Sequence, residues 1–392
     1  MDTPLVEEGF TMNARTPVIV AARRTPFGRR NGGLSQVHPT ALLATVHDAV
    51  LHDAGLEPRD VDVVMTGAVT QIGEQAYNVG RVSVLSGGWP VDIPAFTINA
   101  QCGSSHQAVN LAASAIAAGD ADIVVASGVE SMSRVALGSD RAEGLGDVLD
   151  AEFRARYEVT GAGESADRIA EKWGITREEC DAFSRRSHAR AASARQATRP
   201  QLVPVTSDGV EYTDDECIRE TSLAKLATLK PAFRPDGYHT AATSSPITDG
   251  AAAVLLMSSE RAAALGLEPL AAVSTQALVG VDPVLKLTGP IPVTARLLER
   301  SGLALSDIDS FEINEAFSSV VLAWLREYKV DAARVNPDGG AIALGHPVGA
   351  TGARLIGAAA HRLRRTGGRR ALVAMCVGGG MGTGTILEAV PR

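Results

Sequence analysis

The stretch "AVLHDAGLEPRDVDVVMTG", residues 49–67, recurs in altered form as "RLLERSGLALSDIDSFEIN", residues 296–314. Gly55 in the first copy corresponds to Gly302 in the second, an offset of 247 residues (302 − 55). Each copy is typical of a helix that ends at a glycine and is followed by a short loop and a buried strand. An internal repeat indicates a fold assembled from similar units. We therefore predict two related α/β halves.

The correspondence extends beyond these two stretches. After the first copy, Cys102 precedes a small-residue helix and the apolar strand "ADIVVASG". After the second copy, "GGAIALGHPVGATGARLIGAAAHRL" reads as a turn and a helix, and the strand "RRALVAMCVGGG" follows. Cys102 and His346 thus occupy similar places in two copies of one unit. Pseudo-twofold packing of the copies would bring the two turns together.

The composition places the chain in a broad class. Its 392 residues are 45% hydrophobic and 21% charged, as in globular proteins with two or three structural units. A net charge of −8 argues against nucleic acid as the main partner. The chain lacks the apolar run of about 18 residues that a membrane span needs, and its acidic N-terminus lacks the apolar stretch of a secretory signal. Four scattered cysteines without CxxC argue against disulfides or zinc and favour the cytoplasm.

Charge and glycine content vary along the chain and suggest its division. The region between the halves is richer in charge and helical periodicity, so it reads as an inserted lid-like domain. The start codon is either Met1 or Met12. The predicted division is a disordered tail at 1–15, an N-terminal half at 16–132 plus 244–272, a loop domain at 133–243 and a C-terminal half at 273–392.

Cys102 is the first candidate for chemistry. It follows the strand-like "AFTIN" and precedes a helix with Ser104 and Ser105 near its cap. The positive end of the helix dipole there would lower the pKa of the thiol and favour the nucleophilic thiolate. The alternative is an inert core residue, as most free cysteines are. His106, four residues further on, would share the helix face and could contact the thiol.

Three further residues stand at predicted turns or strand ends. His346 is surrounded by glycines that allow close backbone approach; its imidazole is either a base and oxyanion donor or a satisfied turn residue. Cys376 ends an apolar strand, so its thiol either points out of the sheet's end or belongs to the core. Asn314 follows the strand of the second repeat and is either a helix cap or an amide that orients water.

Other familiar motifs do not fit. The glycine run at 378–384 lacks the GxGxxG spacing and is followed by the strand-like "TILEAV", so a dinucleotide site is disfavoured. Neither a phosphate-binding loop motif nor a metal spacing such as HExxH occurs. With His239 as the exception, we expect surface or capping roles for the remaining histidines: His38, His47, His52, His188, His239 and His361.

Together these residues resemble the thiolase family, from Thr16 to Arg392. The resemblance is carried by "NAQCGSSHQAV", "ASGVESMS", "SPITDGAAAVLLMS", "EINEAFSSV", "GGAIALGHPVGATGAR" and "CVGGGMGTG". It implies an α/β thiolase fold of two similar βαβαβαββ halves in α/β/α/β/α layers, with an inserted loop domain. It also implies a homodimer or homotetramer.

The resemblance assigns a role to each candidate. Cys102 matches the nucleophile that takes up the acyl group, and His346 matches the histidine that activates it and helps form an oxyanion hole. Asn314 matches the asparagine that holds the water of that hole. Cys376 matches the acid/base that exchanges a proton with the α-carbon or with the CoA thiol. Gly378 and the backbone N–H of Cys102 match the second oxyanion hole.

Substrate contacts are assigned in the same way. In "DECIRETS", Arg219 matches an arginine near the adenine nucleotide of CoA, and Ser245 matches a serine that contacts pantetheine. Short-chain biosynthetic members carry methionines where this chain has Ala162 and Lys286, so the resemblance implies a wider acyl pocket. We also assign Phe317 to that pocket.

The chain departs from the family pattern directly behind the nucleophile. Many members read Cys-Gly-Ser-Gly, whereas here Ser105 replaces the second glycine and His106 follows. The helix geometry behind the nucleophile is therefore expected to differ slightly from that of other members.

The implied function is thiolysis of a 3-oxoacyl-CoA by CoA, a reversible Claisen condensation that gives acetyl-CoA and a shortened acyl-CoA. We expect a degradative enzyme that accepts acyl chains longer or bulkier than acetoacetyl. The stretches "RNGGLSQVHPTALL" and "SSPITDGAAA" are most similar to actinobacterial thiolases, and some of these act on steroid side-chain thioesters. CoA and acyl-CoA are the substrates, and no metal or redox cofactor is expected. The alternatives are a biosynthetic acetoacetyl-CoA thiolase, a decarboxylating ketoacyl synthase and a non-catalytic acyl-CoA-binding protein.

Overall fold

The computed structural model describes residues 12–390 and contains a mixed 10-stranded sheet. Its strand order is β10-β11-β12-β9-β1-β8-β5-β3-β4, with β2 also paired to β8. The two halves of this path are joined by a short β1–β9 ladder, in which Val18 faces Ala272 and Ile19 faces Ala271. The sheet therefore consists of two layers that meet at one short seam.

The N-terminal half builds the layer β1-β8-β5-β3-β4. Strand β8 arrives from far along the chain and lies antiparallel between β1 and β5. The elements of this half are β1 (Pro17–Arg24), β2 (Gly28–Arg29), α1 (Pro39–Ala54), β3 (Val63–Gly67), α2 (Val79–Ser86), β4 (Ala95–Ile98), α3 (Ser104–Ala118), β5 (Ile123–Ser131), β8 (Thr248–Ser258) and α8 (Ser259–Ala264).

The C-terminal half builds the layer β9-β12-β11-β10. Strands β10 and β11 are parallel, and β12 runs antiparallel to both β11 and β9. The elements of this half are β9 (Ala271–Gly280), α9 (Pro290–Ser301), β10 (Ser310–Ile313), α10 (Ser318–Tyr328), α11 (Ala341–Leu344), α12 (Thr351–Thr366), β11 (Arg370–Val377) and β12 (Met381–Glu388).

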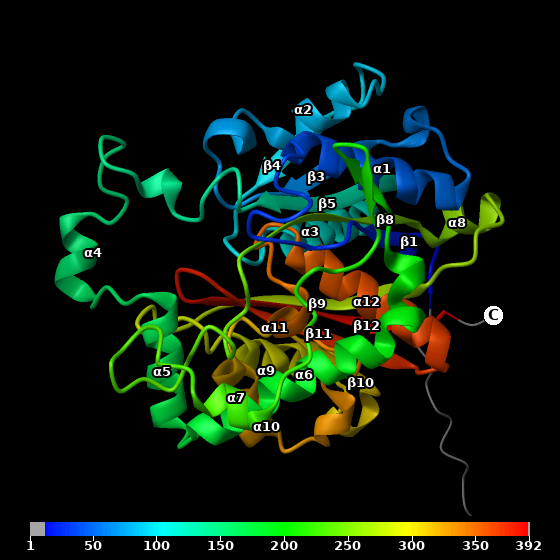
Figure 1. The fold of residues 1–392 in the computed structure, drawn as a ribbon. Helices are drawn as coiled ribbons and strands as arrows, with labels where there is room; N and C mark the ends of the chain where they lie inside the picture. Colours follow the sequence, from blue (N-terminus) through cyan, green and yellow to red (C-terminus); the bar gives the residue numbers. More distant parts are fainter. Residues whose placement is uncertain (1–11, 391–392) are drawn as a thin grey trace, which may run out of the picture.

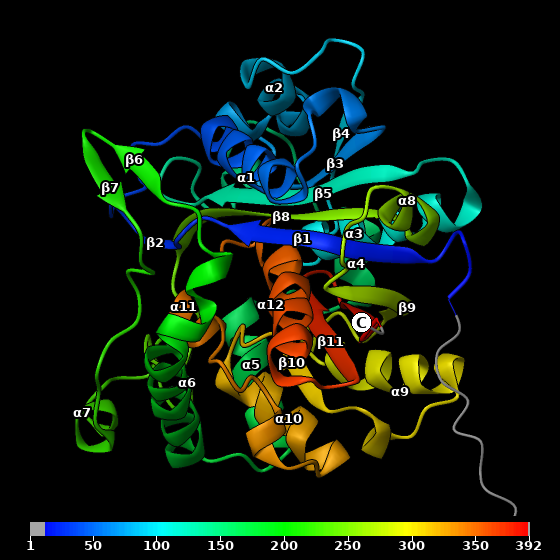
Figure 2. The same cartoon turned by 90° about the vertical axis from the view of Figure 1, so that its right-hand side faces the viewer.

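Helices cover and separate the two sheet layers. Helices α1 and α2 lie on one outer face, α9 and α10 on the opposite outer face, and α3 and α12 run between the sheets (Figures 1 and 2). Ile116 of α3 and Ile356 of α12 are fully buried in one apolar cluster with residues of both sheets, including Val124 and Val373. The predicted α/β/α/β/α layering is confirmed.

The internal repeat is visible in the geometry of its glycines and helices. Gly55 ends α1 with φ 63°, and Gly302 ends α9 with φ 69°, a left-handed conformation that glycine adopts without steric cost. Helix α3 begins at Ser104 and α12 at Thr351, again 247 residues apart (351 − 104). The two copies thus agree in their helix boundaries as well as in sequence.

A helical segment connects β5 to β8 and packs on the C-terminal half (Figure 1). Its elements are α4 (Ala151–Arg156), α5 (Ala162–Lys172), α6 (Arg177–Thr198), the hairpin β6 (Val205–Ser207) and β7 (Val210–Tyr212), and α7 (Leu223–Ala227). Arg326 of α10 donates to both carboxylate oxygens of Glu179 at 2.8 Å. The Ser187 hydroxyl donates to Glu315 at 2.6 Å. These bonds join α6 to the half that carries Asn314.

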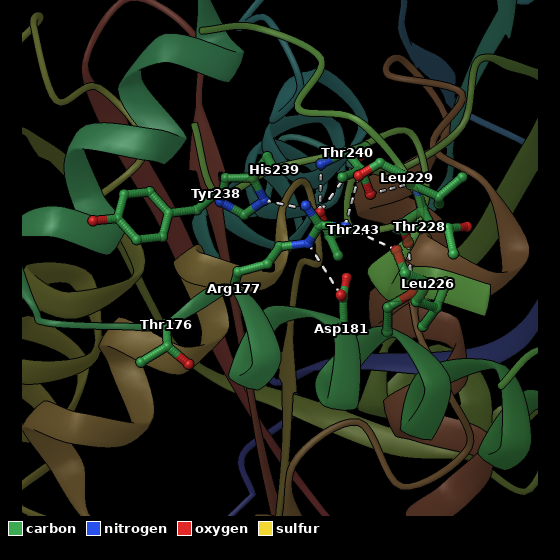
Figure 3. A network of polar contacts seen from close by, with 12 residues as sticks. Thr176, Arg177, Asp181, Leu226, Thr228, Leu229, Tyr238, His239, Thr240 and Thr243 are labelled. Carbon is green, nitrogen blue, oxygen red and sulfur yellow. Dashed lines mark hydrogen bonds and ion pairs between the residues drawn. The ribbon is translucent and has the colours of Figure 1, made fainter. Parts of the chain in front are cut away.

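Arg177 at the start of α6 organises this segment internally (Figure 3). Its guanidinium bonds Asp181 at 3.0 Å and donates to the carbonyl oxygens of Leu226 and Leu229 at 2.8 and 3.1 Å. The charge of one side chain thereby fixes α7 and the turn after it against α6. His239 lies beside this network, with its Nδ1 3.3 Å from the Thr243 hydroxyl.

Most of the predicted tail, residues 1–11 with Met1, lies outside the described residues. Arg15, the last residue of the predicted tail, donates to the carbonyl oxygens of Ile116 and Ala121. Among residues 12–390, no helix is both long and apolar enough to cross a membrane.

Candidate active site

Cys102 lies in the tight connection between β4 and α3. The preceding Gln101 has φ 49°, a left-handed conformation that costs a non-glycine residue about 1–2 kcal/mol. The Ser104 hydroxyl offsets this strain by accepting from the Ala100 N–H at 3.0 Å and donating to the Gln101 carbonyl. Gly103, rather than a serine, is the N-cap of α3. The strained turn places the thiol directly before the first turn of the helix.

The expected lowering of the Cys102 pKa is wrong. The pKa of this thiol is raised to about 11, chiefly by burial; the Gly378 N–H, which donates to the sulfur, opposes the shift, and the charge of Glu130 adds to it. The sequence prediction considered the α3 dipole but not the residues of the other half that enclose the sulfur. Cys102 therefore rests as a thiol and needs a base to become a nucleophile.

Cys376 faces Cys102 from the end of β11. The residue is fully buried, and burial raises the pKa of its thiol; the nearby Cys102 sulfur raises it further. The strand end packs closely on the nucleophile turn, because a Cβ on Gly103 would lie 2.7 Å from Val377 Cγ2. This packing also brings the Gly378 N–H to the Cys102 sulfur. The structure thus brings both thiols and Gly378 together.

Hydrogen bonding indicates the tautomer of His346. The Thr351 hydroxyl donates to the Pro347 carbonyl at 2.9 Å, so it can only accept from His346 Nδ1, 2.7 Å away. The proton on Nδ1 leaves Nε2 as the acceptor in the neutral ring. Burial, together with the positive charge of Arg354, lowers the pKa of His346 to about 3. The imidazole is therefore neutral and carries its lone pair on Nε2, as a general base requires.

Asn314 links His346 to Cys376. Its Nδ2 lies 3.5 Å from His346 Nε2, and its amide hydrogen-bonds the Cys376 thiol. Its Oδ1 is buried without a partner, although buried amide oxygens are normally paired. Asn314 is not a helix cap, since α10 begins only at Ser318. The side chain therefore presents a free acceptor beside both reactive groups.

Cys102, Cys376, Asn314 and His346 thus form one connected set drawn from both halves. Asn314 hydrogen-bonds the Cys376 thiol and lies 3.5 Å from His346, and the Cys102 and Cys376 thiols are near enough to interact electrostatically. Within the described part of the chain, no group of three or more His, Cys, Asp and Glu side chains could hold a metal ion.

The residues assigned to CoA lie in two places. The Ser245 N–H donates to the Ala316 carbonyl at 3.0 Å, two residues from Asn314. Pro246, the residue after Ser245, contacts the turn that carries His346, because its carbonyl accepts from the His346 N–H. Arg219 lies further away on an exposed segment, where its backbone N–H donates to His188 Nδ1 at 3.3 Å. The structure therefore brings Ser245 to the reactive groups but not Arg219.

The three residues assigned to the acyl pocket gather around the start of α5. Ala162 is the first residue of that helix, and the Lys286 ammonium donates to the Thr160 carbonyl two residues earlier. Phe317 packs edge-on against the Phe233 ring, with centroids 5.6 Å apart, and belongs to the same apolar cluster as Cys376. Apolar packing thus extends from Cys376 past Phe317 towards α5.

His106 does not serve the thiol. It is fully buried, and its Nε2 lies 2.8 Å from the Thr385 hydroxyl on β12. That hydroxyl in turn donates to the Asn110 amide oxygen at 2.6 Å. His106 therefore belongs to the packing between α3 and the C-terminal sheet.

The expectation for the other histidines is partly wrong. His38 caps α1 as predicted, and His239, the expected exception, is buried and packs against Phe317. His47 and His188 are buried rather than exposed. His47 Nε2 bonds the Ser127 hydroxyl, a partner 80 residues away that local sequence could not reveal.

Sequence comparison identifies relatives of the whole chain. The family model "Thiolase, N-terminal domain" matches residues 17–260 and "Thiolase, C-terminal domain" matches 267–389. The chain is 41% identical to a steroid 3-ketoacyl-CoA thiolase of Mycobacterium tuberculosis, over 98% of this chain and 97% of the relative. It is 42% identical to a 3-oxoadipyl-CoA/3-oxo-5,6-dehydrosuberyl-CoA thiolase of Escherichia coli, over 94% and 98%.

Structural comparison agrees. The crystal structure of the Bacillus anthracis acetyl-CoA acetyltransferase superimposes with a TM-score of 0.88 and 37% sequence identity, covering 97% of this chain and 100% of that one. An acetyl-CoA acetyltransferase of Chromobacterium violaceum is 41% identical over 94% of this chain and 98% of the relative.

Proposed function

The chain belongs to the thiolase family and is an acetyl-CoA C-acyltransferase, and on this premise we propose how its residues divide the reaction. The connected set of Cys102, Cys376, Asn314 and His346 carries the proposal. Thiolysis breaks a C–C bond, so the site must receive an acyl fragment and also protonate a carbanion equivalent. Two thiols on opposite sides of one site suit these two tasks.

In the first half-reaction, His346 Nε2 takes the proton of Cys102, and the thiolate attacks the 3-oxo carbon of the substrate. The bond between C2 and C3 then breaks, and its electron pair leaves with C2 as the enolate of acetyl-CoA. The Cys376 thiol gives its proton to C2. The products are free acetyl-CoA, an acyl thioester on Cys102 and a thiolate on Cys376.

In the second half-reaction, the Cys376 thiolate takes the proton of an incoming CoA thiol. The CoA thiolate attacks the acyl-Cys102 thioester and releases the shortened acyl-CoA, and Cys102 recovers its proton from His346. One oxyanion would be stabilised by the His346 imidazole together with a water held by the free Asn314 oxygen. The other would be stabilised by the backbone N–H groups of Cys102 and Gly378. Side chains and CoA supply every group that reacts, so we propose that no cofactor takes part.

We propose that the acyl pocket admits chains longer or bulkier than acetoacetyl. Ala162 is small and exposed at the start of α5, and Lys286 turns its ammonium to a backbone carbonyl. Phe317 and Phe233 pack edge-on against one another close by and offer apolar surface to an acyl chain. The relatives named for steroid and 3-oxoadipyl substrates agree with a pocket of this kind.

A thiolysis assay across a substrate panel tests the proposal. The loss of 3-oxoacyl-CoA absorbance would be followed for acetoacetyl-CoA, medium- and long-chain, 3-oxoadipyl and steroid side-chain substrates, with Cys102→Ala as the control. We expect the bulkier substrates to give the higher kcat/KM. A strong preference for acetoacetyl-CoA would instead identify the biosynthetic enzyme.

Cys376 separates thiolysis from decarboxylating condensation. Decarboxylation generates the carbanion without a second acid/base thiol, so a ketoacyl synthase would tolerate Cys376→Ser with malonyl-type donors. We expect this variant to lose thiolysis by about 10²-fold or more, the usual contribution of a general acid/base. Full activity with malonyl-type donors would contradict the proposal.

We further propose that the enzyme is a homo-oligomer in the cytoplasm. Strand β4 pairs on one side only, and Tyr77, Phe96, Leu111 and Leu278 leave between 41% and 93% of their surface exposed. An open strand edge beside apolar side chains favours pairing with a second copy. Light scattering would give a dimer or tetramer mass, and Phe96→Lys should lower it. All four cysteines are free, as a reducing compartment would keep them.

A further inference from the structure

The turn that carries His346 touches the N-terminal half through two buried oxygen atoms. Glu130 Oε2 accepts from the Gly349 N–H at 3.0 Å, and the Ser105 hydroxyl oxygen accepts from the Ala353 N–H at 3.0 Å. Both side chains are fully buried. We call Glu130 and Ser105 the inter-half clamp.

Glu130 is held as a carboxylate by its partners. Besides Gly349, Oε2 accepts from the Val69 N–H, and Oε1 accepts from the Thr70 N–H and from Gln75 Nε2, at 2.7 to 3.0 Å. All four partners are donors, so a protonated carboxyl would direct its own O–H at another hydrogen. Burial raises the pKa of Glu130 above its ordinary value, although these hydrogen bonds oppose the shift. The four donors favour the ionised form.

The backbones of the two halves approach closely beside the clamp. A Cβ on Gly128 would lie 2.1 Å from the Gly349 carbonyl oxygen, and a Cβ on Gly352 would lie 2.3 Å from the His106 nitrogen. The Ala353 N–H is in the first turn of α12, where backbone donors have no partner within the helix. Ser105 supplies that partner, whereas glycine at position 105 would leave the donor unpaired.

We propose that Glu130 and Ser105 are positioning residues that fix the His346 turn against Cys102. Gly349 lies three residues after His346, and Ala353 lies in the same helical turn as Thr351, which sets the imidazole tautomer. Neither clamp residue contacts a reacting atom, so both act through the turn. This inference rests on the roles proposed above for Cys102 and His346.

Glu130 has a second effect, on the thiol itself. The titratable groups around Cys102 are Glu130 on β5 and Cys376 on β11, with His346 reached through Asn314. The negative charge of Glu130 raises the pKa of Cys102. Removing that charge should therefore ease ionisation of the thiol while the looser turn slows turnover. A purely structural role would not produce these opposite changes.

Glu130→Gln keeps the shape of the side chain but turns an amide towards two N–H donors. We expect kcat to fall by about 10- to 100-fold, because displacing a catalytic group by about 1 Å costs this much. The KM for CoA should stay within about twofold. The midpoint of the pH dependence of Cys102 alkylation by iodoacetamide should move to lower pH.

Ser105→Gly tests the second contact alone. Losing one buried hydrogen bond is expected to lower kcat by roughly 2- to 12-fold. The matched control is Ser258→Ala, because Ser258 is also buried and its hydroxyl accepts a first-turn N–H, that of Arg261 in α8, at 3.2 Å. The control should lose thermal stability while kcat and the alkylation profile stay at wild-type values.

Two results would overturn the clamp. One is folded Glu130→Gln and Ser105→Gly proteins with kcat within twofold of wild type; the other is an equal loss of kcat in Ser258→Ala. If Glu130→Gln does not fold, the comparison of kcat between Ser105→Gly and its control Ser258→Ala decides the question. Thiolysis by Cys102→Ala would instead refute the proposed function, in which Cys102 is the nucleophile. If Cys102→Ala is inactive while both clamp variants are fully active, only the clamp is refuted.

Discussion

The two halves place different chemistry on one shared framework. Cys102 and Gly349 occupy the same position in the two copies, as do Asn99 and His346 (349 − 102 = 346 − 99). In the N-terminal half, the helix begins directly after the partly exposed thiol. In the C-terminal half, α11 comes first and the imidazole stands on a buried turn before the helix. Duplication gave the framework, and each copy kept a different reactive residue on it.

The strand ends show the same contrast. A Cβ on Gly67, at the end of β3, would lie 2.3 Å from the Ser105 nitrogen, so no side chain fits there. The corresponding place after β10 holds Asn314, with its unpaired oxygen. A position that tight packing restricts to glycine in one copy holds a side chain of the reactive site in the other copy. Equivalent positions are therefore not interchangeable, and substitutions at them should have different consequences.

Substitution of the nucleophile should have the largest effect. Cys102→Ala removes the acyl acceptor and is expected to lower thiolysis by about 10⁴-fold or more, as losses of a nucleophile do elsewhere. A radiolabelled 3-oxoacyl-CoA should leave no label on the denatured variant, while the wild type carries the acyl group. Label on the variant would move the nucleophile to another residue.

His346→Gln should follow, with a loss of kcat of about 10²- to 10⁴-fold. Because the pKa of His346 lies at about 3, the imidazole stays neutral across the physiological range. The pH profile of kcat/KM should therefore lack a decline near pH 6.5 that depends on His346. The wild type and His346→Gln should have profiles of the same shape there. Such a decline in a pH profile would mean that His346 titrates at its ordinary pKa.

Gly67→Ala and Asn314→Ala sharpen the comparison of strand ends. The first places a methyl group against the α3 backbone and should lower the unfolding free energy by roughly 1–3 kcal/mol. The second removes an amide whose oxygen has no partner, so it should cost activity and little stability. Urea unfolding should separate the two variants, because only Gly67→Ala should lose stability. Thiolysis should fall in both, since the methyl group in Gly67→Ala also displaces Ser105. An equal loss of stability in Asn314→Ala would contradict a division between packing and chemistry.

The smallest effect concerns pH and His106. Burial lowers the pKa of His106 to about 3, so between pH 6.5 and 3 the unfolded chain binds a proton there that the folded chain does not. The unfolding free energy of the wild type therefore falls as pH drops, by up to about 1.4 kcal/mol per pH unit from this residue. His106→Gln lacks this contribution, so its stability should approach that of the wild type as pH falls from 6.5 to 4.5. Parallel urea curves would contradict the assigned shift.

Much of the fold follows from the sequence because its signals are local. The glycine caps, the small-residue helices and the buried strands recur at a fixed offset, and the layering follows from them. The grouping of Cys102, His346, Asn314 and Cys376 followed from their common place at strand ends and turns. The two paired turns therefore met as expected.

The misjudged features depend on partners far along the chain. The raised pKa of Cys102 comes from enclosure by the other half, and the burial of His47 from a hydroxyl on β5. The sequence reading also missed Thr351 and Glu130. Thr351 follows His346 by five residues and could have been found as a nearby hydroxyl, but nothing local marks Glu130 as the acceptor of a donor in the other half.

The position of β8 has a consequence for synthesis on the ribosome. This fully buried strand joins β1 to β5, yet the chain makes 116 residues between the end of β5 and its start (247 − 131). At about 5–20 residues per second, that interval lasts roughly 6–23 s. Throughout it, the emerging half-domain has an unfilled gap at the centre of its first sheet. Ribosome-associated chaperones would have this gap to shield. A translational pause before residue 248 would lengthen the time for which the gap is exposed.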